Sequence, residues 1–227
     1  MATSAIDASQ RKAARVVGWA YLLAIPPAVF AEAAATASNI VAHERLFRLG
    51  TAANLAAFAL DVVLITSLYV VLKPVNRNLA LLATFWGLIE TAILIVATVS
   101  DLEALRVLSG ADYLHVFEAD RLQALARLSL SAHGAAYHVG LVLAGLRSTV
   151  FSYLWLKSNF IPKPLAAWGV FSSLLLAACT YASIIFPELA KVVTVAYYGG
   201  PIFIFELTMG FWLLFKELRP APDTPLS

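Results

Sequence analysis

The sequence predicts an all-α, polytopic membrane protein. We expect a bundle of six transmembrane helices with an amphipathic segment on the outer face between the third and fourth. Of the 227 residues, 61% are hydrophobic and 13% charged, and the mean hydropathy is +0.81. Soluble domains are about 45–50% apolar and about 25% charged. Six apolar stretches also approach the length of about 20 residues that a spanning helix needs. This composition excludes a disordered chain, a nucleic-acid-binding protein with a basic patch and a soluble enzyme.

The first expected span, residues 13–37, contains Pro26 and Pro27, which we expect to kink it. Basic residues precede it and Ala31–Ala33 resembles a cleavage site, which together give the outline of a signal peptide. We interpret it instead as a retained signal-anchor span, because the loop charges require a first helix. The other spans are expected in the same transmembrane domain, over 1–227, at residues 51–72, 79–100, 129–156, 165–186 and 192–215.

The only long polar stretch runs from Asp101 to Arg127. Its apolar residues recur every three to five positions, which is typical of an amphipathic helix; they are Leu114, Phe117, Leu122, Leu125 and Leu128. We expect this segment either to lie on the membrane surface or to extend the neighbouring spans.

The distribution of Lys and Arg predicts the orientation. One side of the expected bundle collects nine basic residues with few acids, whereas the other side mixes both signs. Because short cytoplasmic loops are enriched in Lys and Arg, we expect the basic side and both termini to be cytoplasmic. The nine residues are Arg11, Lys12, Arg15, Lys73, Arg77, Lys157, Lys163, Lys216 and Arg219.

Seven ionisable side chains fall inside the expected spans. A charge at the centre of a spanning helix costs about 2.5–3.5 kcal/mol, and such residues usually face the bundle interior or a wet cavity. We therefore expect a shared polar pocket that opens outward and has its floor near the middle of the membrane. The seven residues are Glu32, Asp61, Glu90, His133, His138, Arg147 and Glu206.

The chemistry expected of this pocket is proton transfer. A carboxylic acid in an apolar site can act as an acid, and a second carboxylate or a histidine can accept the proton. We expect Glu90 to be the general acid or base, Asp61 its partner and His138 a proton acceptor or substrate contact. Trp86 would form a wall that stabilises a developing cation. Further substrate-binding residues are expected to be Asn54, Tyr137, Glu32 and Glu206. This set favours isomerisation or cyclisation of a lipid or isoprenoid by an intramembrane enzyme.

Structural roles are open alternatives for several of these residues. Glu32 and His133 could lie at the outer interface. Asp61 and Glu90 could be polar contacts between helices, made to Asn54, Thr91 or Arg147. Glu206 could form a buried ion pair with Arg147.

Other functions also stay open at this stage. A proton-coupled transporter or channel would use the same acids, with residues 199–201 (Gly-Gly-Pro) as a hinge or binding site. A non-enzymatic accessory subunit would use them to bind a partner helix. We expect no cofactor, although a metal or haem at His138 or His133 is left open; the two point about 140° apart and cannot easily chelate one ion together. Expected partners are membrane lipids, a lipophilic small molecule and, as an open possibility, a second copy of the chain, but no nucleic acid.

Four segments resemble a bacterial membrane family known as domain of unknown function 4386. The order and spacing of these segments match as well as their composition, and the likeness covers about residues 15–219. It implies a bacterial source and a compact helical membrane domain, and it implies no activity. We expect the chain to lie in the bacterial inner membrane. The segments are Leu46–Gly50 (LFRLG), Leu72–Arg77 (LKPVNR), His133–Leu141 (HGAAYHVGL) and Ser158–Pro162 (SNFIP).

Overall fold

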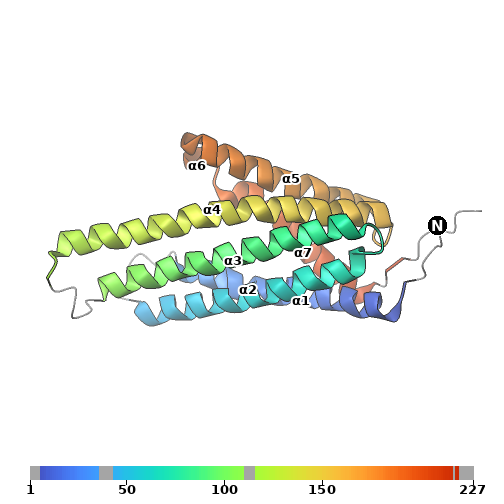
Figure 1. Cartoon of the computed structure of the whole chain (residues 1–227), viewed down its shortest axis with the longest axis horizontal. Helices are drawn as coiled ribbons and strands as arrows, with labels where there is room; N and C mark the ends of the chain where they lie inside the picture. Colours follow the sequence, from blue (N-terminus) through green and yellow to red (C-terminus); the bar gives the residue numbers. More distant parts are fainter. Residues whose placement is uncertain (1–5, 36–42, 110–115, 217, 220–227) are drawn as a thin grey trace, which may run out of the picture.

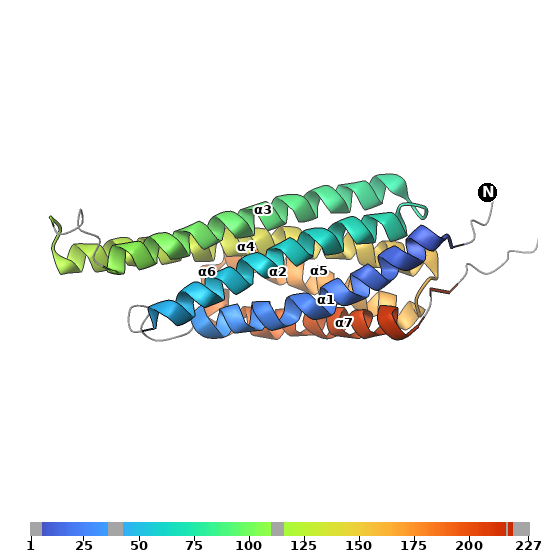
Figure 2. The ribbon, with the colours of Figure 1, turned by 90° about the horizontal axis from the view of Figure 1, so that it is seen from below.

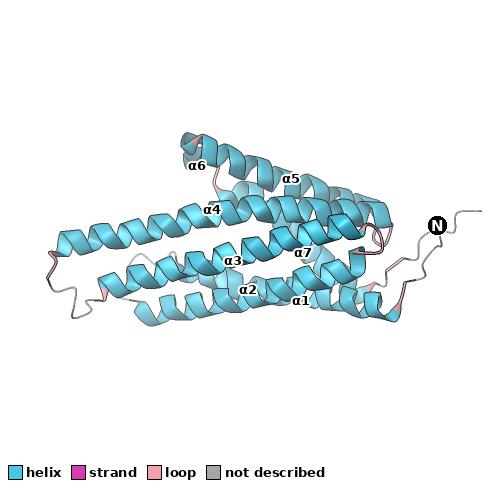
Figure 3. Ribbon diagram, in the orientation of Figure 1, coloured by secondary structure: helices cyan, strands magenta, loops and turns pink. Residues whose placement is uncertain are grey.

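The computed structural model describes residues 6–35, 43–109, 116–216 and 218–219, without the side chains of residues 32–35 and 191. Within these ranges every regular element is a helix (Figure 3). In chain order they are α1 (Ala8–Ala35), α2 (Glu44–Leu72), α3 (Arg77–Leu108), α4 (Ala119–Ser158), α5 (Lys163–Ile185), α6 (Pro187–Val192) and α7 (Val195–Phe215).

The predicted all-α membrane architecture is confirmed. Six of the helices, all but the short α6, are long and apolar enough to span a membrane. Each corresponds to one of the predicted spans, with ends that differ by a few residues except at the start of α2, the end of α3 and the start of α4. The chain is therefore a multi-pass membrane protein. α1 continues through Pro26 and Pro27 as one helix.

The six long helices form a ring in which α4 lies between α3 and α5. α4 packs against α3 on one side and α5 on the other, while α1 pairs with α2 and α7 closes the ring between α1 and α5 (Figure 1). Glycine permits a close approach of α4 and α5. A Cβ on Gly145 of α4 would lie 2.7 Å from the backbone nitrogen of Ala177 on α5.

α3 and α4 are longer than a membrane is thick. Their 32 and 40 residues correspond to about 48 Å and about 60 Å of helix, against about 30 Å of hydrocarbon. The two helices extend together beyond the others at the end opposite the N-terminus (Figure 1). Of the two placements expected for the amphipathic segment, the described part therefore adopts the extension of neighbouring spans; residues 110–115, including Leu114, lie outside the description.

The opposite end gathers the start of α1, the α2–α3 and α4–α5 turns and the end of α7 (Figure 2). Asn76 caps α3, because its side-chain oxygen accepts a hydrogen bond from the backbone N–H of Leu79. Asn159 ends α4 in the left-handed conformation, with φ 57°, which asparagine tolerates better than most residues. Gln10 of α1 donates a buried hydrogen bond to the carbonyl of Val71.

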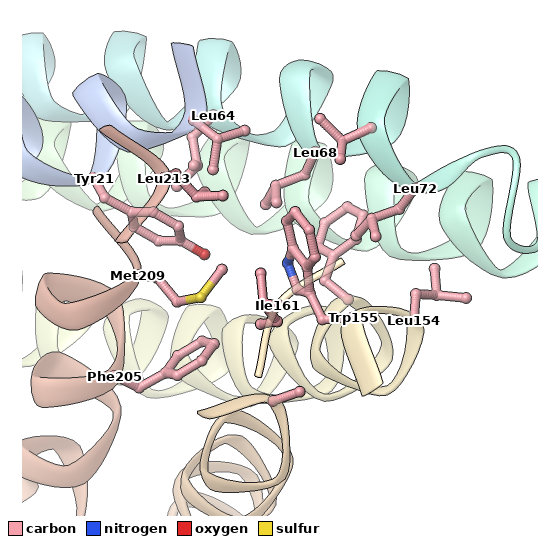
Figure 4. Packing of buried hydrophobic residues seen from close by; sticks show 14 of the residues in the cluster. Tyr21, Leu64, Leu68, Leu72, Leu154, Trp155, Ile161, Phe205, Met209 and Leu213 are labelled. Carbon is pink, nitrogen blue, oxygen red and sulfur yellow. The ribbon is translucent and has the colours of Figure 1, made fainter. Parts of the chain in front are cut away.

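The hydrophobic core lies towards this end of the bundle. Leu64 and Leu68 of α2, Trp155 of α4 and Phe205 and Met209 of α7 meet there, with Tyr21 of α1 beside them (Figure 4). Many apolar side chains on the outer surface are exposed, as expected of helices that face lipid. This packing fixes the rotation of each helix and so decides which of the intramembrane polar residues can meet.

Candidate functional site

Arg147 is the centre of a buried ionic cluster. It lies on α4, and its side chain is only 7% exposed. The guanidinium reaches Asp61 on α2 and Glu90 on α3, so three helices are tied by one side chain. Arginine suits this position, because its planar group offers several donors in a fixed geometry to two acceptors at once.

Glu90 faces two nitrogens of the guanidinium. Arg147 Nη2 donates a hydrogen bond of 3.3 Å to Glu90 Oε1. Arg147 Nε lies 2.9 Å from Glu90 Oε2; this second contact is ionic, since neither atom forms a well-aligned hydrogen bond. The Glu90 side chain is 6% exposed, so its negative charge is compensated inside the bundle rather than by solvent.

Asp61 is held at both oxygens. Oδ1 accepts a hydrogen bond of 2.9 Å from Arg147 Nη1, and Oδ2 accepts one of 2.9 Å from the hydroxyl of Thr91 on α3. The Asp61 side chain is 19% exposed, about three times as much as either of the other two charged groups. Asp61 is therefore the member of the cluster that an incoming group could reach first.

A small cavity of about 10 Å³ adjoins Arg147. This volume accommodates about one water-sized sphere. Tyr21 of α1, Ser148 and Ser152 of α4 and Glu206 of α7 contribute the polar part of its wall. Figure 4 shows Tyr21, with Leu64, Leu68, Trp155 and Phe205 forming the apolar part. The cavity thus connects the Arg147 cluster with a third carboxylate.

The charges of this region do not balance if every group is ionised. Arg147 carries one positive charge, whereas Asp61, Glu90 and Glu206 would carry three negative charges, which leaves two in excess. An uncompensated charge inside a membrane protein is costly. The arrangement is therefore suited to holding protons among these carboxylates.

The structure brings together only some of the expected site residues. Glu90 and Asp61 both contact Arg147, which was one of the polar contacts between helices left open as a structural role. Thr91 donates a hydrogen bond to Asp61. Glu206 lines the adjacent cavity, without an ion pair to Arg147 among the described contacts. The side chain of Glu32 lies outside the described part of the chain.

His138 is placed away from the cluster. It lies nine residues before Arg147 on α4, about 13.5 Å along the axis and half a turn around it, and its Nδ1 lies 2.8 Å from the carbonyl oxygen of Gly134. Tyr137 stacks on His133 with the ring centroids 6.1 Å apart. Asn54 and Trp86 are half-buried, and within the described ranges neither side chain forms a hydrogen bond.

His133 instead forms a contact between α3 and α4. Its Nδ1 lies 3.0 Å from Asp101 Oδ2 and 3.2 Å from the carbonyl oxygen of Ala97. Because both neighbours are acceptors, the ring carries its hydrogen on Nδ1. Within the described ranges, no three His, Cys, Asp or Glu side chains come close enough to hold a metal ion.

Tyr21, Ser148 and Ser152 were not predicted among the site residues. A hydroxyl in an apolar span costs much less than a charge, so these residues lack the signal that identified the acids. Arg147 was recognised as a possible partner of the acids but was not placed among the site residues. Its depth alone could not show that the guanidinium reaches across α3 to α2.

Comparison with known proteins gives one match. The family model described as domain of unknown function (DUF4386) matches residues 13–216. The match contains the whole Arg147 cluster and every residue that lines the cavity beside it. No curated protein and no solved structure matches this chain.

Proposed function

This chain belongs to the DUF4386 family, and we propose that it is an intramembrane acid–base enzyme acting on a lipid or isoprenoid, with Asp61 and Glu90 as the proton-transferring carboxylates. The observation that carries the proposal is that both carboxylates share the guanidinium of Arg147 while only Asp61 is appreciably exposed. A reacting group would meet Asp61, and Glu90 would exchange the proton behind it.

Arg147 gives this pair its chemical function. A guanidinium that contacts two carboxylates stabilises whichever of them is ionised, so a proton can change places without leaving an unpaired negative charge. The hydroxyl of Thr91 holds the second oxygen of Asp61. The proposed acid–base pair therefore does not use His138, which lies on another face of α4.

The experiment compares membrane lipids from cells that express the wild-type chain, Asp61→Asn or Glu90→Gln. We expect a lipophilic species that is altered by the wild type and unaltered by either variant, identified by mass spectrometry of whole lipid extracts. We also expect Asp61→Asn to retain that species during purification. Glu103→Gln is the matched control, since Glu103 is an exposed carboxylate on the same helix as Glu90. Identical lipid profiles for all four proteins would reject the enzyme.

A proton-coupled transporter or channel is the second candidate, and the cavity that joins Arg147 to Glu206 favours it. The test is proton uptake into proteoliposomes that contain a pH-sensitive dye and are held at an imposed membrane potential. This candidate requires uptake in the wild type and at least tenfold slower uptake in Glu206→Gln. If the wild type shows no proton uptake but does alter the lipid profile, the transporter is rejected and the enzyme is the remaining candidate. The buried position of Glu90 gives no support to an accessory subunit that presents its acids to a partner helix.

The orientation belongs to the same proposal. The nine basic residues of the expected cytoplasmic side fall at the end of the bundle that holds the start of α1 and the end of α7. We place this end in the cytoplasm of a bacterium and the α3–α4 extension outside the inner membrane. The test fuses to the C-terminus either a reporter enzyme that is active only in the cytoplasm or one that is active only in the periplasm. We expect activity from the cytoplasmic reporter. Activity from the periplasmic reporter alone would reverse the orientation.

A further inference from the structure

A second, larger cavity lies between the beginning of α1 and the end of α7. Its volume is about 270 Å³. Arg11 and Arg15 line it from α1, and Lys216 lines it from the end of α7. It shares no lining residue with the cavity beside Arg147, so what it binds is independent of the function proposed above.

Two glycines mark a close contact of α1 and α7 near this cavity. Deeper in the membrane α1 and α7 touch at two glycines, where a Cβ on Gly18 would lie 3.0 Å from the carbonyl oxygen of Gly210. Three residues towards the helix ends, Arg15 begins the cavity wall. Arg11 and Arg15 are four residues apart and therefore share one face of α1.

The charged residues that the structure describes in the cavity wall are all basic. Within the described ranges, neither Arg15 nor Lys216 forms an ion pair with a carboxylate. Both lie at the end of a spanning helix, where the headgroups of a bilayer are found. Basic pockets between spanning helices on the cytoplasmic side are suited to anionic headgroups.

The rest of the wall is apolar. Leu213, Leu214 and Leu218 line the cavity beside the basic residues, and the Phe215 side chain is strongly exposed. Ligand pockets usually have volumes of about 300–1,000 Å³, so this cavity suits a headgroup rather than an entire lipid, whose chains would follow the apolar surface outside. A free anion would gain nothing from that surface.

We propose that this cavity binds the phosphate-bearing headgroup of an anionic phospholipid, with Arg15 and Lys216 as its ligands. Each basic residue near a membrane surface contributes attraction worth about a fivefold change in affinity. Removal of both charges should therefore weaken binding about 25-fold. The proposal concerns a bound lipid at the edge of the bundle and not a substrate at Arg147.

The experiment measures lipid binding to the purified full-length protein in detergent by native mass spectrometry. Dioleoylphosphatidylglycerol is titrated against dioleoylphosphatidylcholine, and inorganic phosphate is titrated separately. We expect the wild type to bind the anionic lipid more tightly than the zwitterionic one. R15Q/K216Q should bind the anionic lipid about 25-fold more weakly than the wild type does, and R15K/K216R should keep most of the wild-type affinity. K73Q/K157Q is the matched control, since it removes two charges from the same end of the bundle but outside the cavity.

Each other outcome overturns the proposal. Equal binding of the two lipids by the wild type would remove the role of the headgroup charge. Inorganic phosphate binding as tightly as the lipid would assign the cavity to a soluble anion. An equal loss in K73Q/K157Q would show attraction to the whole basic end rather than to this cavity. If R15Q/K216Q does not fold, the proposal is still tested by two measurements. These are the preference of the wild type for the anionic lipid and the binding of that lipid by R15K/K216R.

Discussion

Gly87 of α3 lies directly beneath the side chain of Arg147 on α4. A Cβ at position 87 would lie 2.5 Å from Arg147 Cδ and 2.7 Å from Ile65 Cδ1. The absence of a side chain therefore opens the path by which the guanidinium reaches Asp61 on α2. A packing contact with no charge of its own thus determines the geometry of the ionic cluster.

Gly87→Ala should disrupt the cluster more than it disrupts the fold. The added methyl group must displace Arg147 or Ile65, and such overpacking costs about 1–3 kcal/mol. We expect a lower thermal midpoint in detergent, measured by size-exclusion chromatography after heating, and loss of the lipid conversion assigned to Asp61. Gly200→Ala is the control, because a Cβ there meets nothing within 4 Å. Full activity in Gly87→Ala would contradict the importance of this contact.

Arg147→Met should destabilise the protein strongly, because it leaves Asp61 and Glu90 without their counter-charge. Removing one partner of a buried ion pair costs about 3–5 kcal/mol, whereas replacing the whole group by neutral side chains is often tolerated. We therefore expect the triple variant D61N/E90Q/R147M to recover most of the stability lost in Arg147→Met and none of the activity. Unfolding in a denaturing detergent, followed by tryptophan fluorescence, gives the stability. Recovery of both properties would mean that the cluster is only structural.

Two glycines of α4 should respond in opposite ways to alanine. At Gly145 the new Cβ would lie 2.7–2.9 Å from three atoms of Ala177, two of them backbone, so α4 and α5 must separate. At Gly134 it meets nothing within 4 Å, and alanine favours a helix over glycine by about 1 kcal/mol. We expect Gly145→Ala to lower the thermal midpoint and Gly134→Ala to leave it unchanged or raise it. Equal effects at both positions would contradict the packing of α4 on α5.

Asn76→Ala should destabilise the start of α3 by about 1 kcal/mol, the usual value of a helix cap. The side chain of Asn76 accepts the hydrogen bond of the Leu79 N–H, which alanine cannot. Asn76→Asp keeps an acceptor and should retain most of the stability. Hydrogen exchange at residues 77–80, measured by mass spectrometry, reports this local effect. Unchanged exchange in Asn76→Ala would show that the cap contributes nothing.

Hydropathy predicted the spans because each helix must place about 20 apolar residues in the lipid. The same signal could not locate the end of α3 or the start of α4, since both helices continue into polar sequence where lipid no longer constrains composition. Asp120 and Arg127 therefore lie within α4 although they fall outside its predicted span. The length of a helix beyond the membrane depends on local propensity and on its partner, which hydropathy does not measure.

Part of the site was predictable by depth. Asp61 and Glu90 lie near mid-membrane when residues are counted from the expected ends, and they do meet. His138 seemed equally suitable by type, yet α4 turns it half a revolution away from Arg147. The rotation of each helix is set by packing such as Gly145 against Ala177. One sequence alone does not reveal which faces are paired.

α4 is one uninterrupted helix from Ala119 to Ser158, and it carries Arg147. Arg147 lies 28 residues after its first residue, which corresponds to about 42 Å of helix. A probe attached near Ala119 therefore reports on the tilt of the segment that presents the guanidinium. Conversely, a displacement of this end of α4 would be carried along one continuous helix to the three-helix junction at Asp61 and Glu90.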